Sequence, residues 1–221
     1  MARVTHISPQ PPKAEPGLSD AALVAAALRR EAWAAEELFR RHADAANGLA
    51  FRLLGRDNEL DDVVQDAYLI VLDQLHRLKD PQSFAAFLAT VIVRRVRRLL
   101  RRRRFARALG LMPAAEPADP TGCIAQLAPA DAVVELRSLY RAVERLPTNE
   151  RLALLLRHIE GLPFEQIASM CGCSLATVKR RVSAAEARLA AWGAFVEEDA
   201  ARGAAQDDSP LAGHIAERRA P

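Results

Sequence analysis

The segment 84–104 restricts the possible fold more than any other part of the sequence, because an apolar pattern runs through a block of arginines. Apolar residues recur at steps of four, four and three positions, the spacing of one helix face, at Leu88, Ile92, Val96 and Leu99. The last eleven residues of the segment, 94–104, hold eight arginines and no acid. A disordered basic tail has no physical reason to keep an apolar stripe in register. The pattern therefore predicts a packed helix with one buried face and one cationic face.

The composition favours helices in the rest of the chain as well. Ala, Leu and Arg lose little conformational freedom in a helix, and they dominate a chain of 221 residues that is 50% hydrophobic. Strand-like alternation is nearly absent, and no apolar run is long enough for a membrane span or a secretion signal. Cys171 and Cys173 are too close together for an ordinary disulfide, and Cys123 stands alone. This use of cysteine indicates a reducing location, so we expect an all-α cytoplasmic protein without membrane insertion.

Interruptions of the helical pattern divide the chain into two small helical domains. The proline-rich residues 1–18 predict a disordered leader before a first helical domain over 19–105. Residues 106–130 contain four prolines and no sustained period, which predicts a flexible linker. The helical pattern resumes over 131–195, and the polar residues 196–221 predict a flexible tail.

Capping residues set the expected ends of the helices in the first domain. Ser19 is a good N-cap for a first helix, and Gly55 is a typical stop for a second helix that begins near Glu31. Asp80 followed by Pro81 marks the start of the helix that runs into the arginine block. The acids between these two points therefore lie on a helix of their own.

Acidic and amide side chains crowd the first two turns of that acidic helix. Asp62, Gln65 and Asp66 are three and four positions apart and so share one face, and Asp61 lies beside them. One interpretation is that this face binds a basic surface on a partner. The alternative is that the acids only compensate the positive end of the helix dipole.

Residues 163–192 follow the pattern of a helix-turn-helix. A short helix that begins at Pro163 ends at Gly172, and Ser174 is a good N-cap for a longer second helix. Hydroxyl and cationic side chains in the first turns of the second helix could meet base edges and phosphates in a major groove: Ser174, Thr177, Lys179, Arg180 and Arg181. The pattern indicates DNA binding, and the alternative is an ordinary helical hairpin with solvated cations.

No segment has the pattern of a catalytic, metal or cofactor site. Cys171 and Cys173 have the spacing CxC without a second pair, so we interpret them as small residues that fill the turn rather than as zinc ligands. The five histidines are scattered along the chain, and no glycine-rich phosphate loop occurs. We therefore expect neither an enzyme nor a bound metal or cofactor.

Two runs of residues resemble one family of bacterial proteins. The run LPFEQIASMCGCSLATVKRRVSAAEARL (162–189) is similar to the fourth conserved region of bacterial sigma factors in the extracytoplasmic-function (ECF) group. The run DDVVQDAYLIVLDQL (61–75), followed by SFAAFLATVIVRRVRRLLRRRR (83–104), resembles the second conserved region of the same family. Both runs occur in the order that the family has, with a short linker between them.

The resemblance implies a dissociable subunit of RNA polymerase that directs promoter-specific initiation. It implies contacts with the clamp helices of the largest core subunit from Asp61, Asp62, Gln65 and Asp66. It implies that the helix-turn-helix residues named above bind the −35 element of promoter DNA. The −10 element would meet the arginine-rich helix, through Arg94, Arg97, Arg98, Arg101 and Arg104. Many members are held inactive by an anti-sigma factor, which makes such a protein a candidate partner.

The arginine-rich helix departs from the family's usual sequence, WLYRIARNLALDWLRRRR. Arg94 stands where the family has asparagine, Arg98 where it has aspartate, and Leu99 where it has an aromatic residue that could stack on unpaired bases. Arginine contacts to phosphate hold DNA without reading its sequence. Two alternatives therefore stay open: a degenerate sigma-like adaptor that binds polymerase or a partner without directing initiation, and a helix-turn-helix transcriptional regulator. Such regulators usually carry an α/β receiver domain, for which this helical sequence has no pattern.

Overall fold

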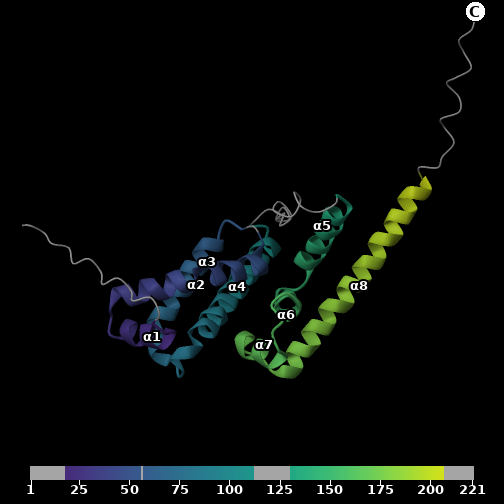
Figure 1. The fold of residues 1–221 in the computed structure, drawn as a ribbon. Helices are drawn as coiled ribbons and strands as arrows, with labels where there is room; N and C mark the ends of the chain where they lie inside the picture. The colour runs from purple at the N-terminus through teal and green to yellow at the C-terminus, as the bar shows by residue number, and fades with distance from the viewer. Residues whose placement is uncertain (1–17, 56, 112–129, 207–221) are drawn as a thin grey trace, which may run out of the picture.

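The computed structural model describes residues 18–55, 57–111 and 130–206, and every regular element in these ranges is a helix (Figure 1). The first group consists of α1 (Asp20–Leu28), α2 (Ala32–Leu54), α3 (Leu60–Asp73) and α4 (Phe84–Ala108), with the short 3-10 turns η1 (Leu75–Arg77) and η2 (Pro81–Ser83) before α4. The second group consists of α5 (Ala130–Arg145), α6 (Thr148–His158), α7 (Phe164–Cys171) and α8 (Leu175–Gln206). The predicted all-α class with two groups of helices is confirmed.

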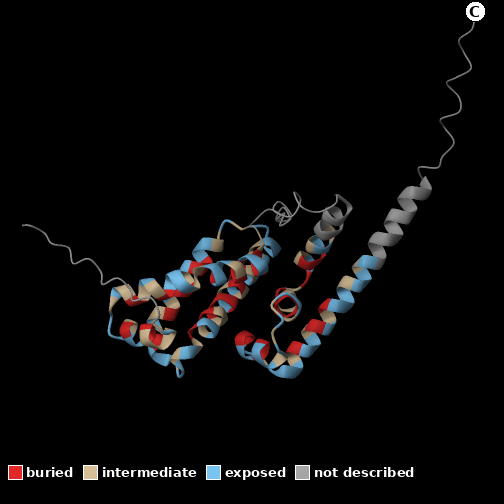
Figure 2. Cartoon of the chain, in the orientation of Figure 1, coloured by how far each residue is buried: buried red, intermediate tan, exposed pale blue. Residues whose placement is uncertain are grey.

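The first group is a bundle in which α2, α3 and α4 pack on one another and α1 lies against α2. The apolar stripe predicted for α4 is confirmed, because its members are at most 7% exposed: Leu88, Ile92, Val96 and Leu99. Phe84 at the start of α4 is fully buried beside Tyr68 of α3, whose hydroxyl donates to the Ala35 carbonyl of α2. Figure 2 shows the buried positions along the inner sides of these helices. Burial of one side of α4 leaves most of its arginines on the other side.

The capping residues named from the sequence have the predicted roles. The Ser19 hydroxyl accepts a hydrogen bond from the Ala22 N–H at 3.3 Å, and Gly55 follows α2 with a φ of +80°. Asp80 accepts from the Gln82 N–H at 3.0 Å and begins η2, which leads directly into α4. Local chemistry at these positions sets where α1, α2 and α4 begin or end.

Two helices are longer than the sequence predicts. α4 continues to Ala108 because the alanines near its end favour helix, and Gly110 then ends it with a φ of +69°. The backbone of α8 continues to Gln206, although a tail was predicted from residue 196, because this stretch is also rich in alanine. Other predicted segments lie outside the described residues, namely most of the leader (1–17), most of the linker (112–129) and the end of the tail (207–221).

The second group contains the predicted helix-turn-helix. Gly172 adopts the left-handed conformation at the end of α7, with a φ of +61°. The Ser174 hydroxyl accepts from the Thr177 N–H at 3.2 Å and caps α8. Ile167 of α7 and Val178 of α8 are fully buried in the core of this group. The predicted turn and N-cap are therefore confirmed.

The two groups of helices also pack against each other. α4 contacts both α6 and α7, and α2 contacts α6. Buried apolar residues of both groups belong to one continuous cluster. The sequence predicts two domains but does not predict this contact, because it joins side chains that lie far apart along the chain.

Candidate polymerase and nucleic-acid interfaces

Three of the four predicted polymerase-binding residues form an exposed face on α3. Asp61, Asp62 and Gln65 are exposed and make no hydrogen bond or ion pair within the described ranges. Leu69 continues this face one turn later and is 58% exposed. The search for acids missed it, although its four-residue distance from Gln65 could have revealed it. Unpaired carboxylates beside an exposed apolar side chain suit a protein partner that carries cations.

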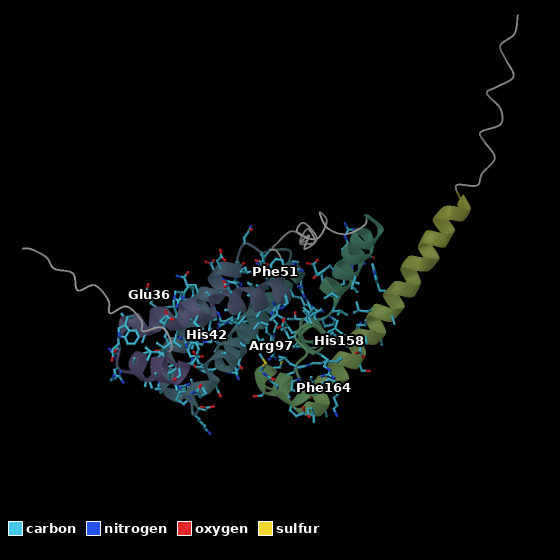
Figure 3. All side chains as sticks on the ribbon, viewed as in Figure 1. Glu36, His42, Phe51, Arg97, His158 and Phe164 are labelled. Carbon is cyan, nitrogen blue, oxygen red and sulfur yellow. The ribbon has the colours of Figure 1, made fainter. Side chains whose placement is uncertain are left out.

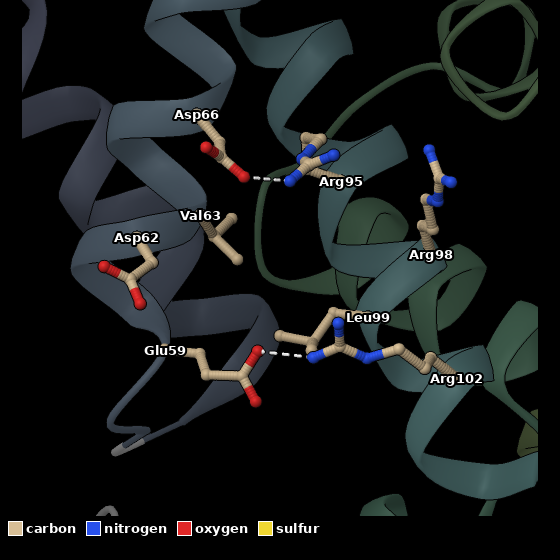
Figure 4. A pocket seen from close by; sticks show the side chains of 8 residues that line it. All are labelled: Glu59, Asp62, Val63, Asp66, Arg95, Arg98, Leu99 and Arg102. Atoms are coloured by element: carbon tan, nitrogen blue, oxygen red, sulfur yellow. Dashed lines mark hydrogen bonds and ion pairs between the residues drawn. The ribbon is translucent and has the colours of Figure 1, made fainter. Parts of the chain in front are cut away.

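Asp66, the fourth predicted residue, pairs with α4. Its carboxylate accepts a hydrogen bond from the Arg95 guanidinium, and half of the Asp66 side chain remains exposed. Figure 4 shows this ion pair beside a hollow of about 450 Å³ between α3 and α4, where Glu59 also pairs with Arg102 at 3.0 Å. The acidic motif is therefore divided, because Asp66 joins two helices of the bundle whereas the preceding acids of α3 stay open to a partner.

Asp57, an acid that the sequence analysis did not single out, fixes the start of α3. It accepts two hydrogen bonds from the Arg103 guanidinium, one of them at 2.8 Å, and a third from the Glu59 backbone N–H at 2.8 Å. The Glu59 carboxylate also accepts from Arg103, at 2.9 Å. The bonds from Arg103 hold the pKa of Asp57 below its usual range, partial burial opposes them, and the Glu59 N–H lowers the pKa further. Arg103 is therefore a structural member of the arginine block.

The five arginines predicted to contact DNA on α4 divide into two sets. Four of them line a hollow of about 320 Å³ that has no acid in its walls: Arg94, Arg97, Arg98 and Arg101. Arg98, Arg101 and Arg104 are exposed and have no acidic partner in the part of the chain that the structure describes. Arg97 is half-buried and donates to the Cys171 carbonyl of α7, whereas Arg94 is exposed and donates to the Met170 carbonyl at 3.4 Å; Figure 3 labels Arg97 on this side of α4. The three free guanidiniums lie one turn apart and could hold a phosphate backbone.

The predicted DNA-reading residues in the first turns of α8 differ in whether their side chains make contacts within the protein. Lys179 and Arg180 are exposed. Ser174 and Thr177 share a hydrogen bond between their hydroxyl oxygens at 2.8 Å, as part of the helix cap. Arg181 donates to the Cys173 sulfur at 3.3 Å, inside the turn. The Lys179 ammonium lies over the Phe164 ring of α7, 5.8 Å from the ring centroid. Arg180 is therefore the side chain that can extend into a groove without breaking a contact that shapes the motif.

The turn of this motif holds both cysteines that were considered as metal ligands. Cys171 is buried, and burial raises the pKa of its thiol. Among the side chains that the structure describes, no group of three or more His, Cys, Asp or Glu is placed to hold a metal ion. Among the same residues, no helix combines the length and the apolar character needed to cross a bilayer.

Comparison with known families covers both groups of helices. The family described as Sigma-70 region 2 matches residues 38–106, and the family described as Sigma-70, region 4 matches residues 136–189. The ECF RNA polymerase sigma factor SigM of Mycobacterium tuberculosis is 32% identical over 174 residues, or 78% of this chain and 83% of that protein. This chain belongs to the ECF group of RNA polymerase sigma factors. As a sigma factor, it binds core RNA polymerase and promoter DNA and directs transcription initiation.

Other sigma factors resemble this one in sequence or in fold. The ferric citrate uptake sigma factor FecI of Escherichia coli is 29% identical over 153 residues, which is 68% of this sigma factor and 85% of FecI. RpoE of Bartonella quintana, solved with the anti-sigma factor NepR, has a TM-score of 0.52 at 24% identity and covers 71% of this chain and 94% of its own. CnrH, solved with the cytosolic domain of CnrY, has a TM-score of 0.52 at 25% identity, covering 81% and 98%. The family is not an enzyme family.

Proposed function

We propose that this sigma factor works in the cytoplasm and docks on the clamp helices of the largest polymerase subunit through the exposed face of α3. The observation that carries this proposal is that only some of the acids in and before α3 pair with arginines. Asp57 and Asp66 are paired with arginines of α4, whereas Asp61 and Asp62 remain unpaired in the described structure. Exposed acids without a partner contribute little to stability, so the fold does not require them. A basic partner surface gives them a function.

The promoter is held by two surfaces of different character. The exposed Lys179 and Arg180 lie near the N-terminal end of α8, the end that a helix-turn-helix inserts into the major groove, and they read the −35 element. Arg98, Arg101 and Arg104 hold the phosphate backbone near the −10 element, where such contacts position DNA without specifying its sequence. In this arrangement α8 recognises the promoter sequence and α4 binds the phosphate backbone.

The sequence leaves a degenerate adaptor open because Leu99 replaces an aromatic residue. The structure supports an initiating role more strongly, because Leu99 is only 7% exposed and faces the core. Phe105 is 67% exposed and lies four positions after Arg101, on the same side of α4. An exposed ring beside free guanidiniums could stack on an unpaired base, with about 1–3 kcal/mol per base.

A charge-reversal experiment tests the docking proposal. The double variant Asp61→Arg with Asp62→Arg should lose binding to core polymerase in a pull-down while keeping its circular dichroism spectrum. It leaves the Asp66–Arg95 ion pair intact. The matched control is Glu36→Arg, because Glu36 is an exposed acid on α2 outside the proposed face (Figure 3). Equal polymerase binding by wild type and double variant would contradict the proposal, as would equal loss in the control.

A further inference from the structure

Two thiols lie at the turn of the helix-turn-helix, on either side of Gly172. Cys171 is the last residue of α7 and is only 5% exposed. Cys173 is partly exposed and directly precedes Ser174, the N-cap of α8. The proposed polymerase and DNA contacts use neither sulfur. Small apolar residues would fill the same turn, so packing alone does not require two cysteines.

The Cys173 sulfur has the surroundings of a reactive cysteine. The Arg181 guanidinium, from the second turn of α8, donates to this sulfur at 3.3 Å. The position of Cys173 just before α8 also places it at the positive end of that helix dipole. Guanidiniums and helix N-termini stabilise the thiolate, which is the form of cysteine that attacks peroxides. Partial exposure of Cys173 lets a small oxidant reach it.

The Cys171 sulfur has different surroundings, at the negative end of the α7 dipole. Burial raises the pKa of its thiol, and the charge of Cys173 raises this pKa further. Three nearby guanidiniums oppose these effects, those of Arg97, Arg181 and Arg94. Cys171 is therefore a poor first nucleophile, but it lies only two residues from a better one. A reactive, accessible thiol beside a second thiol that can resolve its oxidised form is the arrangement of a redox-sensitive pair.

We infer that Cys173 and Cys171 form a peroxide-sensitive dithiol that controls binding of the −35 element by α8. This inference rests on the proposed role of α8 in reading that element, and it adds a regulation of the same helix.

The oxidation proceeds in two steps. The Cys173 thiolate attacks hydrogen peroxide, so that an S–O bond forms, the O–O bond breaks, and the released hydroxide takes up a proton to become water. The Cys171 thiol then gives up its proton, and its sulfur displaces hydroxide from the sulfenic acid on Cys173. In this step the S–S bond forms, the S–O bond breaks, and the proton and hydroxide leave as a second water. Each disulfide therefore reduces one peroxide to water.

The disulfide changes the turn that sets the direction of α8. In the reduced protein Gly172 has a φ of +61°, and the Cys173 N–H donates to the Ala168 carbonyl at 3.0 Å. Bonding two sulfurs that are one residue apart closes a small ring, which constrains this backbone and takes the Cys173 sulfur away from Arg181. The start of α8 therefore moves, and Arg180 moves with it. Such a short ring is strained, and strained disulfides are readily reduced, so the change is reversible.

Thiol chemistry tests the dithiol independently of DNA. The full chain has three cysteines, so Cys123→Ser leaves only the proposed pair. Hydrogen peroxide should remove both free thiols, and mass spectrometry of the peptide that holds both cysteines should show the loss of two hydrogen atoms. Cys171→Ala should stop the reaction at the sulfenic acid on Cys173, which dimedone traps. Arg181→Gln should slow the oxidation roughly threefold, because a smaller thiolate fraction is partly offset by a more nucleophilic sulfur.

A mobility-shift assay with a promoter duplex that reduced wild type binds measures the effect on α8. Oxidation should lower the affinity about tenfold, comparable to the loss of one base contact, and a thiol reductant should restore it. Cys173→Ser is the matched control, because a serine hydroxyl is small and can still accept a hydrogen bond from Arg181. Its affinity should not respond to peroxide, and its circular dichroism spectrum should match that of wild type.

Free thiols that persist in Cys123→Ser after peroxide treatment would overturn the dithiol. Loss of the thiols without a disulfide would overturn the role of Cys171, and a disulfide without a loss of affinity would overturn the control of α8. If reduced wild type bound no promoter duplex, the proposed role of α8 would fail, while the thiol count would still decide whether the disulfide forms.

Discussion

Replacement of Asp57 by alanine separates the structural acids of this sigma factor from the acids proposed to bind polymerase. Asp57 is 10% exposed and accepts three hydrogen bonds, two of them from Arg103, which is itself 18% exposed. With alanine at position 57, the carboxylate that still pairs with Arg103 is that of Glu59, whose side chain is more exposed than that of Asp57. Hydrogen bonds to charged groups contribute about 1.5–3 kcal/mol each, and the remaining pair offsets part of the loss. We expect Asp57→Ala to lower the free energy of unfolding by about 2–3 kcal/mol.

Urea denaturation followed by circular dichroism measures this loss directly. The unfolding midpoint should fall for Asp57→Ala while the slope of the transition stays the same, because the surface exposed on unfolding hardly changes. Asp62→Ala is the matched control, since Asp62 is an exposed acid without an ion pair in the described ranges, and its effect should stay within about 0.5 kcal/mol. Equal midpoints for the two variants would refute the view that Asp57 ties α3 to α4.

The pH dependence of the same measurement follows from the lowered pKa of Asp57. A carboxylate whose folded-state pKa lies below its ordinary value of 3.8 stabilises the fold fully above that value. This stabilisation is lost as the pH falls through the folded-state pKa, because the carboxylate then takes up a proton in both states. The difference in stability between wild type and Asp57→Ala should therefore be largest near neutral pH and should shrink below pH 3.8. A difference that stays constant into this acidic range would contradict the ion pair as its cause.

Three further predictions concern binding. Affinity for duplex DNA should fall steeply with salt, and replacing Arg101 and Arg104 by glutamine should reduce the slope of log affinity against log salt concentration by roughly 2. A flat plot for wild type would contradict binding to the phosphate backbone. Arg180→Ala should weaken promoter binding in a mobility-shift assay and leave polymerase binding unchanged, and loss of both would indicate misfolding. Leu69→Asp should weaken polymerase binding without lowering the unfolding midpoint, because Leu69 is 58% exposed, and unchanged binding would exclude it from the docking face.

The sequence predicts those features that depend on neighbours along the chain. The apolar stripe from Leu88 to Leu99 has a helical period, so it could be predicted from the sequence alone. The N-cap at Ser174 could also be predicted, because it depends on the residues directly after it. The free face of α3 was also predictable, except for Leu69, because residues three and four positions apart share a side of a helix.

The sequence does not predict the contacts between distant segments. Asp57 and Arg103 are separated by 46 residues, and nothing near either residue marks it as a partner of the other. Arg97 and the Cys171 carbonyl are separated by 74 residues, and their contact exists only because the two domains pack together. The helical period placed Arg97 correctly on the face opposite the apolar stripe, but the periodicity of one helix cannot show which of its arginines another domain uses.

The central claim is that this chain directs initiation through an α3 docking face and DNA-binding surfaces on α4 and α8. Sequencing of transcripts made in a defined mixture tests this claim most directly. Core polymerase, the purified sigma factor and a library of promoter fragments are combined, and the transcript start sites are compared with those of core polymerase alone. The account predicts that start sites become enriched downstream of one shared pair of elements, and that Asp61→Arg with Asp62→Arg or Arg180→Ala abolishes the enrichment. Polymerase binding without enrichment would contradict the account and would identify the protein as an adaptor.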